Sequence, residues 1–224
     1  MKAMCVADIH GDIETLNKLR KSVAKIDVDY FFLLGDYSFD PKNEEKNKAD
    51  VTNVVGLLSD YNVRAIPGNC DHKSIISILE KSYTSLHKTV MTLIPGYSII
   101  GFGGSNPTPF NTEFEYSEAE ILESLNNLYS KVDEGTKVIL IAHAPPKDTK
   151  CDVIRSGLHV GSSAIRQFIE SKKPDLVLCS HIHESGGAED TLGETRIVNI
   201  GRLSEGRAYL LTLSGDIKLE FYKG

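Results

Sequence analysis

The chain has little cysteine, with four residues among 224 and no C-x-x-C pair. Cys5 and Cys179 lie in apolar, strand-like runs, where a reduced cysteine behaves as a small hydrophobic side chain. This usage is typical of the cytosol, where disulfides are rare, so we expect a cytoplasmic protein. A chain of this length buries roughly 70% of the surface that it exposes when unfolded, so its fold needs no stabilising disulfide bond or structural zinc ion.

Long apolar runs and an excess of positive charge are also missing. The longest apolar runs, near residues 30–34 and 138–142, fall far short of the roughly 18 residues that a membrane span needs. We also expect no cleaved leader, because polar site candidates already occur at Asp8 and His10. The formal charge of −6 disfavours tight binding to a nucleic-acid backbone. A phosphate-bearing substrate is compatible with this charge if cations lie in the site.

Short, β-branched apolar runs alternate with longer segments of helical periodicity. Residues 2–7, 29–34 and 63–66 are predicted strands, with helices over 12–25 and 46–61 between them. This order predicts a parallel sheet with crossover helices in the first third of the chain. Further strands are predicted at 87–94, 97–102, 137–142 and 175–180, helices at 73–81, 117–132 and 162–172, and only strands and turns over 187–222. No repeat or flexible linker occurs, so we expect a single domain over residues 1–224.

Polar residues collect directly after predicted strands. The five clusters contain Asp8, His10, Asp36, Asn69, His143, His181 and His183. Ligands of α/β sheets bind at the carboxyl ends of strands, so the clusters should meet at one rim. In extended chain, residues i and i+2 point the same way, which pairs Asp8 with His10 and His181 with His183.

These side chains have the composition of a metal centre. Each alone has an ordinary explanation, such as a turn, a helix cap or a core histidine, but five clusters at successive strand ends share no structural reason. Seven candidate ligands are too many for one cation and too rich in oxygen for a structural zinc site. They suit two divalent ions about 3.5–4 Å apart that share one carboxylate.

The motifs D-x-H, G-D, G-N-x-D, A-H-x-P and H-x-H, in this order from Asp8 to about Gly201, resemble the calcineurin-like metallophosphoesterases. The Gly-rich segment 101–105 and the segment 198–201 look like the small prokaryotic members. The resemblance implies an α/β fold, a four-layer α-β-β-α sandwich of two mixed sheets flanked by helices. It also implies that hydroxide bridging two metal ions attacks a phosphate ester. The first ion would be held by Asp8, His10, Asp36 and His183, and the second by Asp36, Asn69, His143 and His181. Mn, Fe, Zn, Co or Ni would suit these ligands.

The sequence departs from the family pattern where the usual general-acid histidine follows the asparagine ligand, because Cys70 stands there. A neutral thiol donates a proton but is a weaker hydrogen-bond donor than imidazolium. His72 is the alternative donor, or else belongs to the first turn of the next helix. His159 precedes a predicted helix whose free N–H groups would receive an anion, so it either contacts the substrate or packs its loop. The catalytic candidates are therefore Asp36, Asn69, Cys70, His72 and His159.

These features favour a phosphodiesterase over a phosphomonoesterase, acting on a small phosphate ester. The alternatives are a metal-binding scaffold or interaction protein on the same fold, a phosphoprotein phosphatase, or a nuclease. All seven ligand-type residues are retained, which favours an enzyme over a scaffold. The net charge and the lack of a basic patch disfavour a nuclease. The natural substrate, the metals, formation of a homo-oligomer and the role of the 103–116 loop stay open at this stage.

Overall fold

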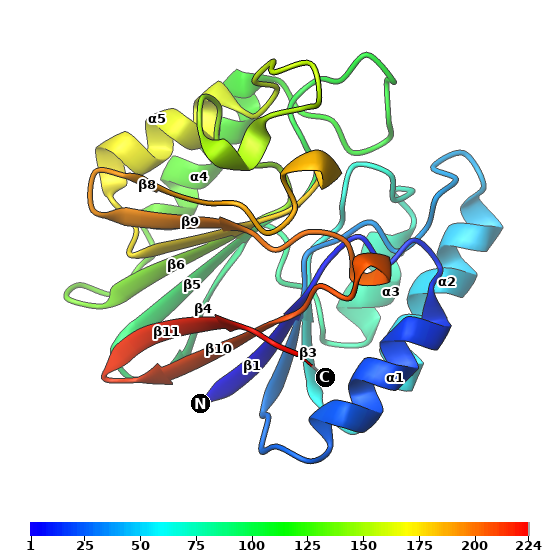
Figure 1. Ribbon diagram of the computed structural model, residues 1–224. Coiled ribbons are helices and arrows are strands. Elements are labelled where there is room, and N and C mark those ends of the chain that lie inside the picture. The colour runs from blue at the N-terminus through cyan, green and yellow to red at the C-terminus, as the bar shows by residue number, and fades with distance from the viewer. Residues whose placement is uncertain (224) are drawn as a thin grey trace.

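Two mixed sheets lie face to face, and helices cover their outer faces, in the computed structural model of the chain, which describes residues 1–223 (Figure 1). The first sheet contains β1 (Lys2–Val6), β2 (Tyr30–Leu33), β3 (Asn62–Ala65), β10 (Tyr209–Ser214) and β11 (Asp216–Phe221). The second contains β4 (Thr89–Ile94), β5 (Tyr97–Phe102), β6 (Lys137–Ala142), β7 (Leu176–Cys179), β8 (Glu189–Leu192) and β9 (Thr195–Asn199). The helices are α1 (Ile13–Val23), α2 (Glu44–Leu57), α3 (Ile75–Lys81), α4 (Glu118–Tyr129) and α5 (Ser163–Lys172).

Both sheets are mixed. The first has the order β11-β10-β1-β2-β3, in which β1, β2 and β3 are parallel, as predicted, and the C-terminal hairpin of β10 and β11 is antiparallel. The second has the order β4-β5-β6-β7-β9-β8, with antiparallel strands at its two edges. This architecture confirms the predicted four-layer sandwich.

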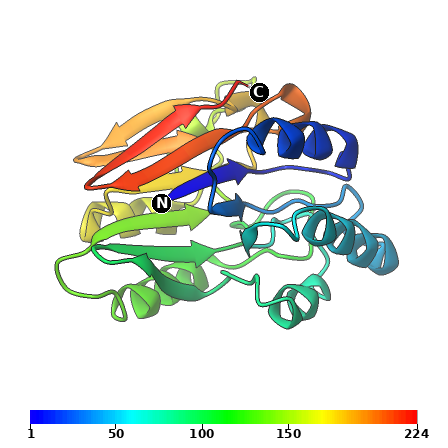
Figure 2. The same ribbon diagram turned by 90° about the horizontal axis from the view of Figure 1, so that it is seen from below.

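Three apolar clusters hold the layers together. One fills the space between the sheets, where side chains such as Cys5, Phe32 and Ile141 meet. The second packs the outer face of the first sheet against α1, α2 and α3, and the third packs the outer face of the second sheet against α4 and α5. Figure 2 shows the layers from below, with α1 and α2 to the right of the strands and α4 and α5 to the lower left.

Local sequence accounts for most helix starts. The Asp12 carboxylate accepts the Thr15 N–H at the start of α1. Ser117 and Glu120 form the predicted capping box of α4. Helix α2 begins at Glu44, two residues before the predicted start, because the Asn43 side chain caps it by accepting the Lys46 N–H.

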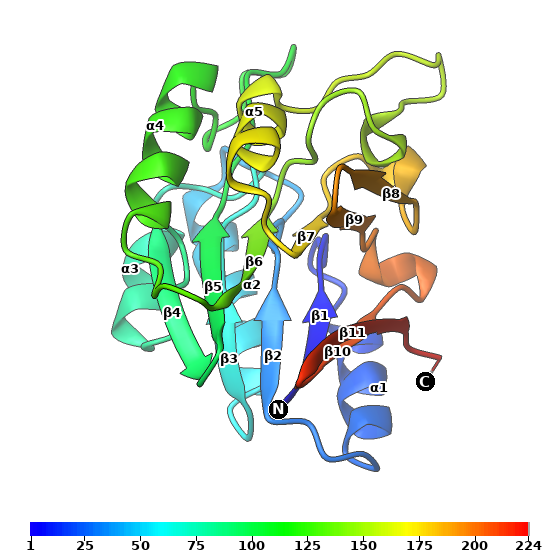
Figure 3. The same ribbon diagram turned by 90° about the vertical axis from the view of Figure 1, so that its left-hand side faces the viewer.

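The parallel strands of both sheets deliver their carboxyl ends to one side of the molecule. In Figure 3 the arrowheads of β1, β2, β5 and β6 point to the top of the view. The segment over 187–222 is not made only of strand and turn, because a short 3₁₀ helix spans Leu203–Glu205. The Leu203 N–H donates to the Ala7 carbonyl over 3.2 Å, so this 3₁₀ turn lies beside the end of β1. No helix of residues 1–223 is long and apolar enough to cross a membrane.

Candidate metal centre

Loops from both sheets meet at the carboxyl ends of the strands and bring the predicted clusters together. The loops after β1 and β2 are joined by backbone hydrogen bonds from Asp8 N–H to the Gly35 carbonyl (3.1 Å) and from His10 N–H to the Asp36 carbonyl (2.9 Å). In the second sheet, the Ser180 N–H donates to the His143 carbonyl over 2.9 Å. The convergence that the strand order predicts is therefore present.

The backbone at this rim is held in unusual conformations. Asp8, His10, Asp36 and His181 have positive φ angles of 48°, 48°, 56° and 68°. Such a conformation costs a non-glycine residue about 1–3 kcal/mol and is concentrated at functional sites. The fold therefore holds these four side chains in place at an energetic cost.

The first group of candidate ligand atoms comprises Asp8, His10 and His183. His10 Nε2 lies 3.4 Å from His183 Nε2, and His183 Nε2 lies 3.6 Å from Asp8 Oδ2. Asp8 is fully buried, and its Oδ1 atom has no hydrogen-bond partner among the described residues. A buried carboxylate oxygen without a donor is costly unless a cation meets it.

The second group comprises Asp8, Asp36 and His143. Asp8 is a member of both groups. Asp36 also faces both, because its Oδ1 is 3.6 Å from His143 Nε2 and its Oδ2 is 3.8 Å from His10 Nε2 of the first group. The His181 ring packs 5.2 Å from the ring of His143. The position of Asp36 therefore matches that of a carboxylate shared by two ions.

Asn69 joins the second group through its side-chain oxygen. Its Nδ2 donates to Thr112 Oγ1 over 3.0 Å, and the Thr112 hydroxyl donates to Glu115 Oε1 over 2.7 Å. Because this carboxylate only accepts, the chain of donors aims Asn69 Oδ1 at His143 Nε2, 3.1 Å away. One role of the loop before α4 is therefore to orient Asn69.

In the second group, two facing atoms are both acceptors. His143 Nδ1 donates to the Leu34 carbonyl over 2.7 Å, and His10 Nδ1 donates to the Ser38 carbonyl over 3.2 Å. Each neutral ring therefore turns an Nε2 lone pair toward the centre, where that of His143 meets the lone pairs of Asn69 Oδ1. Metal-binding histidines are typically oriented by such a bond from the other ring nitrogen. The residues present thus fit divalent cations.

The electrostatics agree with this fit. Burial, and after it the charge of Asp8, raises the pKa of Asp36 to about 8. Burial lowers the pKa of His10 to about 4 and that of His181 to about 3. At neutral pH these imidazoles are uncharged and keep a lone pair for a cation.

Asp71 is a supporting residue whose role the sequence reading missed, although it ends the G-N-x-D motif. Its buried carboxylate accepts N–H groups from Asp36 (2.9 Å), Tyr37 (2.8 Å) and Gly68 (2.7 Å). A Cβ atom on Gly68 would lie 2.0 Å from Asp36 Oδ1. Asp71 and Gly68 together fix the position of Asp36.

Two further buried polar residues support the second sheet's side of the centre. Asn199, in the segment 198–201, donates from Nδ2 to the carbonyls of Cys151 and Ile182, each over 3.0 Å. The Ser180 hydroxyl donates to Asp8. Both residues lie at strand ends, which is the signal that could have identified them.

The structure places Cys70 beside the centre and His72 away from it. The Cys70 N–H donates to Asp36 Oδ1 over 2.9 Å, and burial raises the pKa of the Cys70 thiol. His72 instead contacts Ser74, with its Nδ1 2.9 Å from the hydroxyl, and its backbone N–H donates to Asn47. These contacts place His72 in the turn that precedes α3.

His159 forms a pair with a buried carboxylate. Its Nδ1 lies 2.7 Å from Asp152 Oδ1, and this bond raises the pKa of His159. The prediction that the next helix offers free N–H groups to an anion is wrong. Glu118 of α4 already accepts the N–H groups of Ser163 (3.0 Å) and Ala164 (2.8 Å) at the start of α5.

Two clefts flank the His181–His183 segment. The loop cleft, of about 560 Å³, lies between residues 106–110 and 154–161 and has His181 in its wall. The arginine cleft, of about 610 Å³, is lined by Arg155, His183, Glu184, Gly186, Arg202, Glu205 and Arg207. Glu184 lines both clefts, so they adjoin there. Both clefts therefore reach the candidate ligands.

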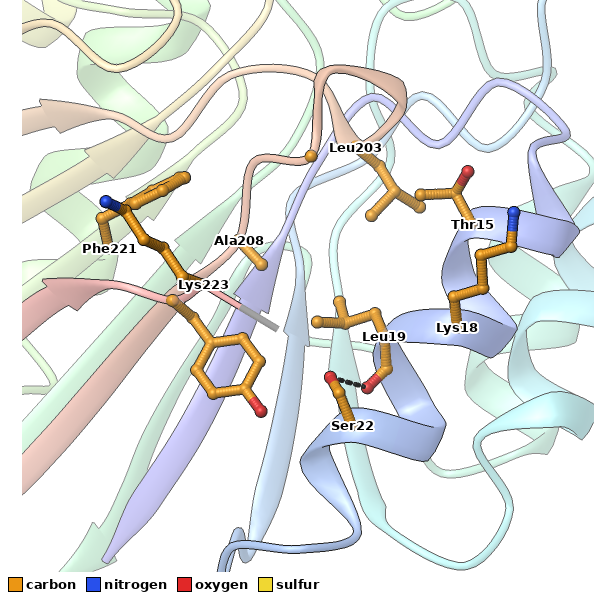
Figure 4. Close-up of a pocket in the computed structure, with 10 residues that line it drawn as sticks. Thr15, Lys18, Leu19, Ser22, Leu203, Ala208, Phe221 and Lys223 are labelled. Carbon is orange, nitrogen blue, oxygen red and sulfur yellow. Dashed lines mark hydrogen bonds between the residues drawn. The ribbon is translucent and has the colours of Figure 1, made fainter.

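A third hollow, of about 350 Å³, lies away from this chemistry. Figure 4 shows Thr15, Lys18 and Leu19 of α1 on one side of it and Ala208 and Phe221 on the other. None of the candidate ligands lines it. It therefore has no part in the metal centre.

The fold and the ligand cluster together define a metal-dependent hydrolase of phosphate esters. The sequence profile of the calcineurin-like phosphoesterases matches residues 1–185, and the chain belongs to this family. Members of the family act at a centre of two divalent metal ions, which agrees with the two groups of ligand atoms. The family resemblance seen in the motifs is confirmed.

Similar proteins extend over nearly the whole chain. An uncharacterized protein of Methanocaldococcus jannaschii, MJ1162, is 35% identical over 204 residues, which cover 89% of this chain and 87% of the relative. The crystal structure of the protein TT1561 of Thermus thermophilus matches with a TM-score of 0.72 at 20% identity and covers 98% of both chains. A dimetal phosphatase from Danio rerio matches with a TM-score of 0.74 at 13% identity, over 99% of this chain and 95% of that one. At these identities the two structures show the fold alone.

Proposed function

We propose that this protein is a phosphodiesterase that uses two divalent ions and acts on a small substrate in the cytoplasm. Mn²⁺ is the metal that we propose to test first. The observation that carries the proposal is the set of facing acceptor atoms, above all Asn69 Oδ1 opposite His143 Nε2 at 3.1 Å. Two lone pairs at this distance repel each other unless a cation lies between them.

The proposed ligands divide between two ions. Asp8, His10 and His183 would hold the first, Asn69, His143 and His181 the second, and Asp36 both. When bound, the ions supply positive charge for the phosphoryl oxygens and lower the pKa of water, so that hydroxide forms at neutral pH. The chain's own part is to fix the ligand oxygens and nitrogens through Asp71, Thr112 and the carbonyls of Leu34 and Ser38.

The two clefts support a diester rather than a monoester. A diester carries two organic substituents on one phosphorus, and a cleft is available on each side of the H-x-H segment, reached by His181 on one side and His183 on the other. The wall of the loop cleft includes Pro107, Pro109 and the exposed ring of Phe110, which suit an apolar substituent.

Cys70 is the candidate proton donor that lies close to the ligands. Cys70 contacts Asp36 through its backbone and carries a protonated thiol. His159 lines the loop cleft with His181, and its bond to Asp152 holds the ring in place, so we assign it to substrate contact. His72 stays a weaker candidate because its ring bonds to Ser74.

Metal analysis combined with two chromogenic substrates tests the proposal. The purified protein should bind two equivalents of Mn²⁺ and hydrolyse bis(p-nitrophenyl) phosphate with a higher kcat/KM than p-nitrophenyl phosphate. Removal of metal with a chelator should abolish both activities, and Mn²⁺ should restore them. Faster cleavage of the monoester would refute the diester preference. Two bound ions without hydrolysis of either ester would support the scaffold alternative.

A further inference from the structure

Three arginines gather beside the metal centre of a chain whose net charge is −6. Arg155, Arg202 and Arg207 line the arginine cleft with His183, and the carboxylates of Glu184 and Glu205 line it too. Three guanidinium groups against two carboxylates leave the cleft positive. Arg155 and Arg202 form no ion pair with any residue of the described part of the chain, so their charges are available to a ligand.

Arg202 lies next to the candidate ligands of the first ion. Its guanidinium carbon is 5.5 Å from the ring centre of Phe39, and this ring stacks on His10 at 4.0 Å with an angle of 10°. Phe39 is 60% exposed, although a ring of this size is normally buried. The Arg202 Nε atom is buried and has no hydrogen-bond partner among the described residues. The Arg202 guanidinium therefore keeps hydrogen-bonding capacity that no described protein group uses.

Arg207 is built into the same wall. A Cβ atom on Gly187 would lie 2.1 Å from Arg207 Nη1, and one on Gly201 would lie 2.3 Å from Arg207 Cδ. Only glycine at these two positions leaves room for the side chain, and both have positive φ angles. Arg207 Nε also contacts Glu205 over 3.2 Å. The space left by the two glycines and the contact with Glu205 place the Arg207 side chain at the cleft.

We propose that the arginine cleft binds a second phosphate group of the substrate, separate from the phosphate that is hydrolysed. The inference rests on the proposed phosphodiesterase function and narrows its substrate to molecules with a further phosphate on one substituent. Arg155 and Arg202 bind this phosphate, because planar guanidinium groups match phosphate oxygens in pairs of parallel hydrogen bonds. His183 belongs to both the cleft and the first ion's ligands, so the two phosphates of one small substrate can reach both places at once.

A matched pair of substrates tests this assignment. Thymidine 5′-(p-nitrophenyl phosphate) and its 3′-phosphorylated form share the scissile bond and the leaving group and differ only in the added phosphate. With Mn²⁺ present, the wild type should cleave the 3′-phosphorylated form with about tenfold higher kcat/KM, chiefly through a lower KM. The ratio of the two kcat/KM values is the readout, because any general loss of activity cancels in it.

Three variants complete the experiment. Arg202→Gln should bring the ratio close to one, and Arg155→Gln, at an exposed position, should lower it severalfold. Arg196→Gln is the matched control, since Arg196 pairs with Glu189 at 2.8 Å and does not line the cleft, and it should keep the wild-type ratio. The preference of the wild type should also weaken as salt is raised, because salt screens charge.

The outcomes separate this inference from the proposed function. A wild-type ratio near one, or an Arg202→Gln ratio equal to that of the wild type, would overturn the arginine cleft as a phosphate site. An equal fall on both substrates in Arg202→Gln would place Arg202 at the scissile phosphate and would also overturn it. If neither diester is cleaved, the proposed function fails. Binding calorimetry in the presence of Mn²⁺ then tests the phosphate site in the arginine cleft by itself. Thymidine 3′,5′-bisphosphate should bind the wild type more tightly than thymidine 5′-monophosphate, and equal affinities would refute the inference.

Discussion

Asp36 faces a histidine of each group of ligand atoms, so its replacement is the most direct test at the scale of one residue. In Asp36→Asn, an amide nitrogen replaces one of the two oxygens that face His10 and His143. We expect loss of bound metal and a fall in kcat/KM of at least about a hundredfold. Metal analysis and a hydrolysis assay on the same sample measure the two effects.

A nearby aspartate provides the control for this substitution. Asp40 is exposed and accepts the backbone N–H of Lys42, so Asp40→Asn should keep both metal and activity. Two bound ions and full turnover in Asp36→Asn would remove Asp36 from the centre.

Cys70 is the residue at which this chain departs most from its family. If its side chain faces the leaving group, Cys70→His supplies a better proton donor and should raise the hydrolysis of alkyl diesters with poor leaving groups. General acid catalysis contributes roughly 10²–10⁴-fold, so a partial gain would be measurable. Nitrophenyl esters should change little, because nitrophenolate departs without a proton.

The variants Cys70→Ala and His72→Ala identify the proton donor. Their metal content is measured as well, because Asn69, a proposed metal ligand, is adjacent to Cys70. A large loss on alkyl esters in His72→Ala but not in Cys70→Ala would make His72 the donor. If Cys70→His, Cys70→Ala and His72→Ala all have equal, small effects on alkyl and nitrophenyl esters, water supplies the proton.

At the scale of structural elements, the segment 147–161 depends on one buried carboxylate. Asp152 is fully buried and accepts N–H groups from Asp148 (3.1 Å), Thr149 (2.9 Å) and Gly161 (3.0 Å) as well as the His159 ring. Asp152→Asn places an amide N–H against some of these donors and should lower the free energy of unfolding by about 1–3 kcal/mol. Denaturant titration measures this change, and an unchanged midpoint would show that the segment is held by other contacts.

His159 tests whether this segment contacts the substrate. His159→Ala should lower kcat/KM while metal content stays the same, because His159 lines the loop cleft and is absent from both groups of ligand atoms. Its folded-state pKa is raised by Asp152. The stability that the ring contributes is therefore present at acid pH and is lost as the pH rises through this raised pKa. Melting curves at several pH values should show the wild type and His159→Ala converging at high pH. Unchanged kcat and KM would assign His159 to loop packing.

Much of the fold and of the site was predictable from short-range patterns. Strands β5 and β6 follow from apolar runs, and the ligand clusters follow from polar residues at strand ends. Contacts between distant segments were not predictable. Glu118 occupies the start of α5 from another helix, and Thr112 orients Asn69 from a loop 43 residues away. Neither partner is indicated by local propensity, because tertiary packing selects it.

At the scale of the whole molecule, the two sheets share one apolar interior, and the metal centre joins loops from both. This arrangement supports the proposal that the chain is one domain, and it predicts a single cooperative thermal transition. Because the ions would bind the folded chain, free Mn²⁺ at 100 times its Kd should stabilise the protein by about 2.7 kcal/mol for each site. Calorimetry should therefore show one transition that moves up by several degrees with Mn²⁺.

The same scans of Asp36→Asn decide the origin of this shift. A variant that binds no ion should melt in one transition at a temperature independent of Mn²⁺, whereas Asp40→Asn should follow the wild type. Two separate transitions in the wild type would divide the chain into independently folding parts. An equal upward shift in Asp36→Asn would mean that Mn²⁺ stabilises the fold from another place, and the two sheets would then be held together without help from the metal centre.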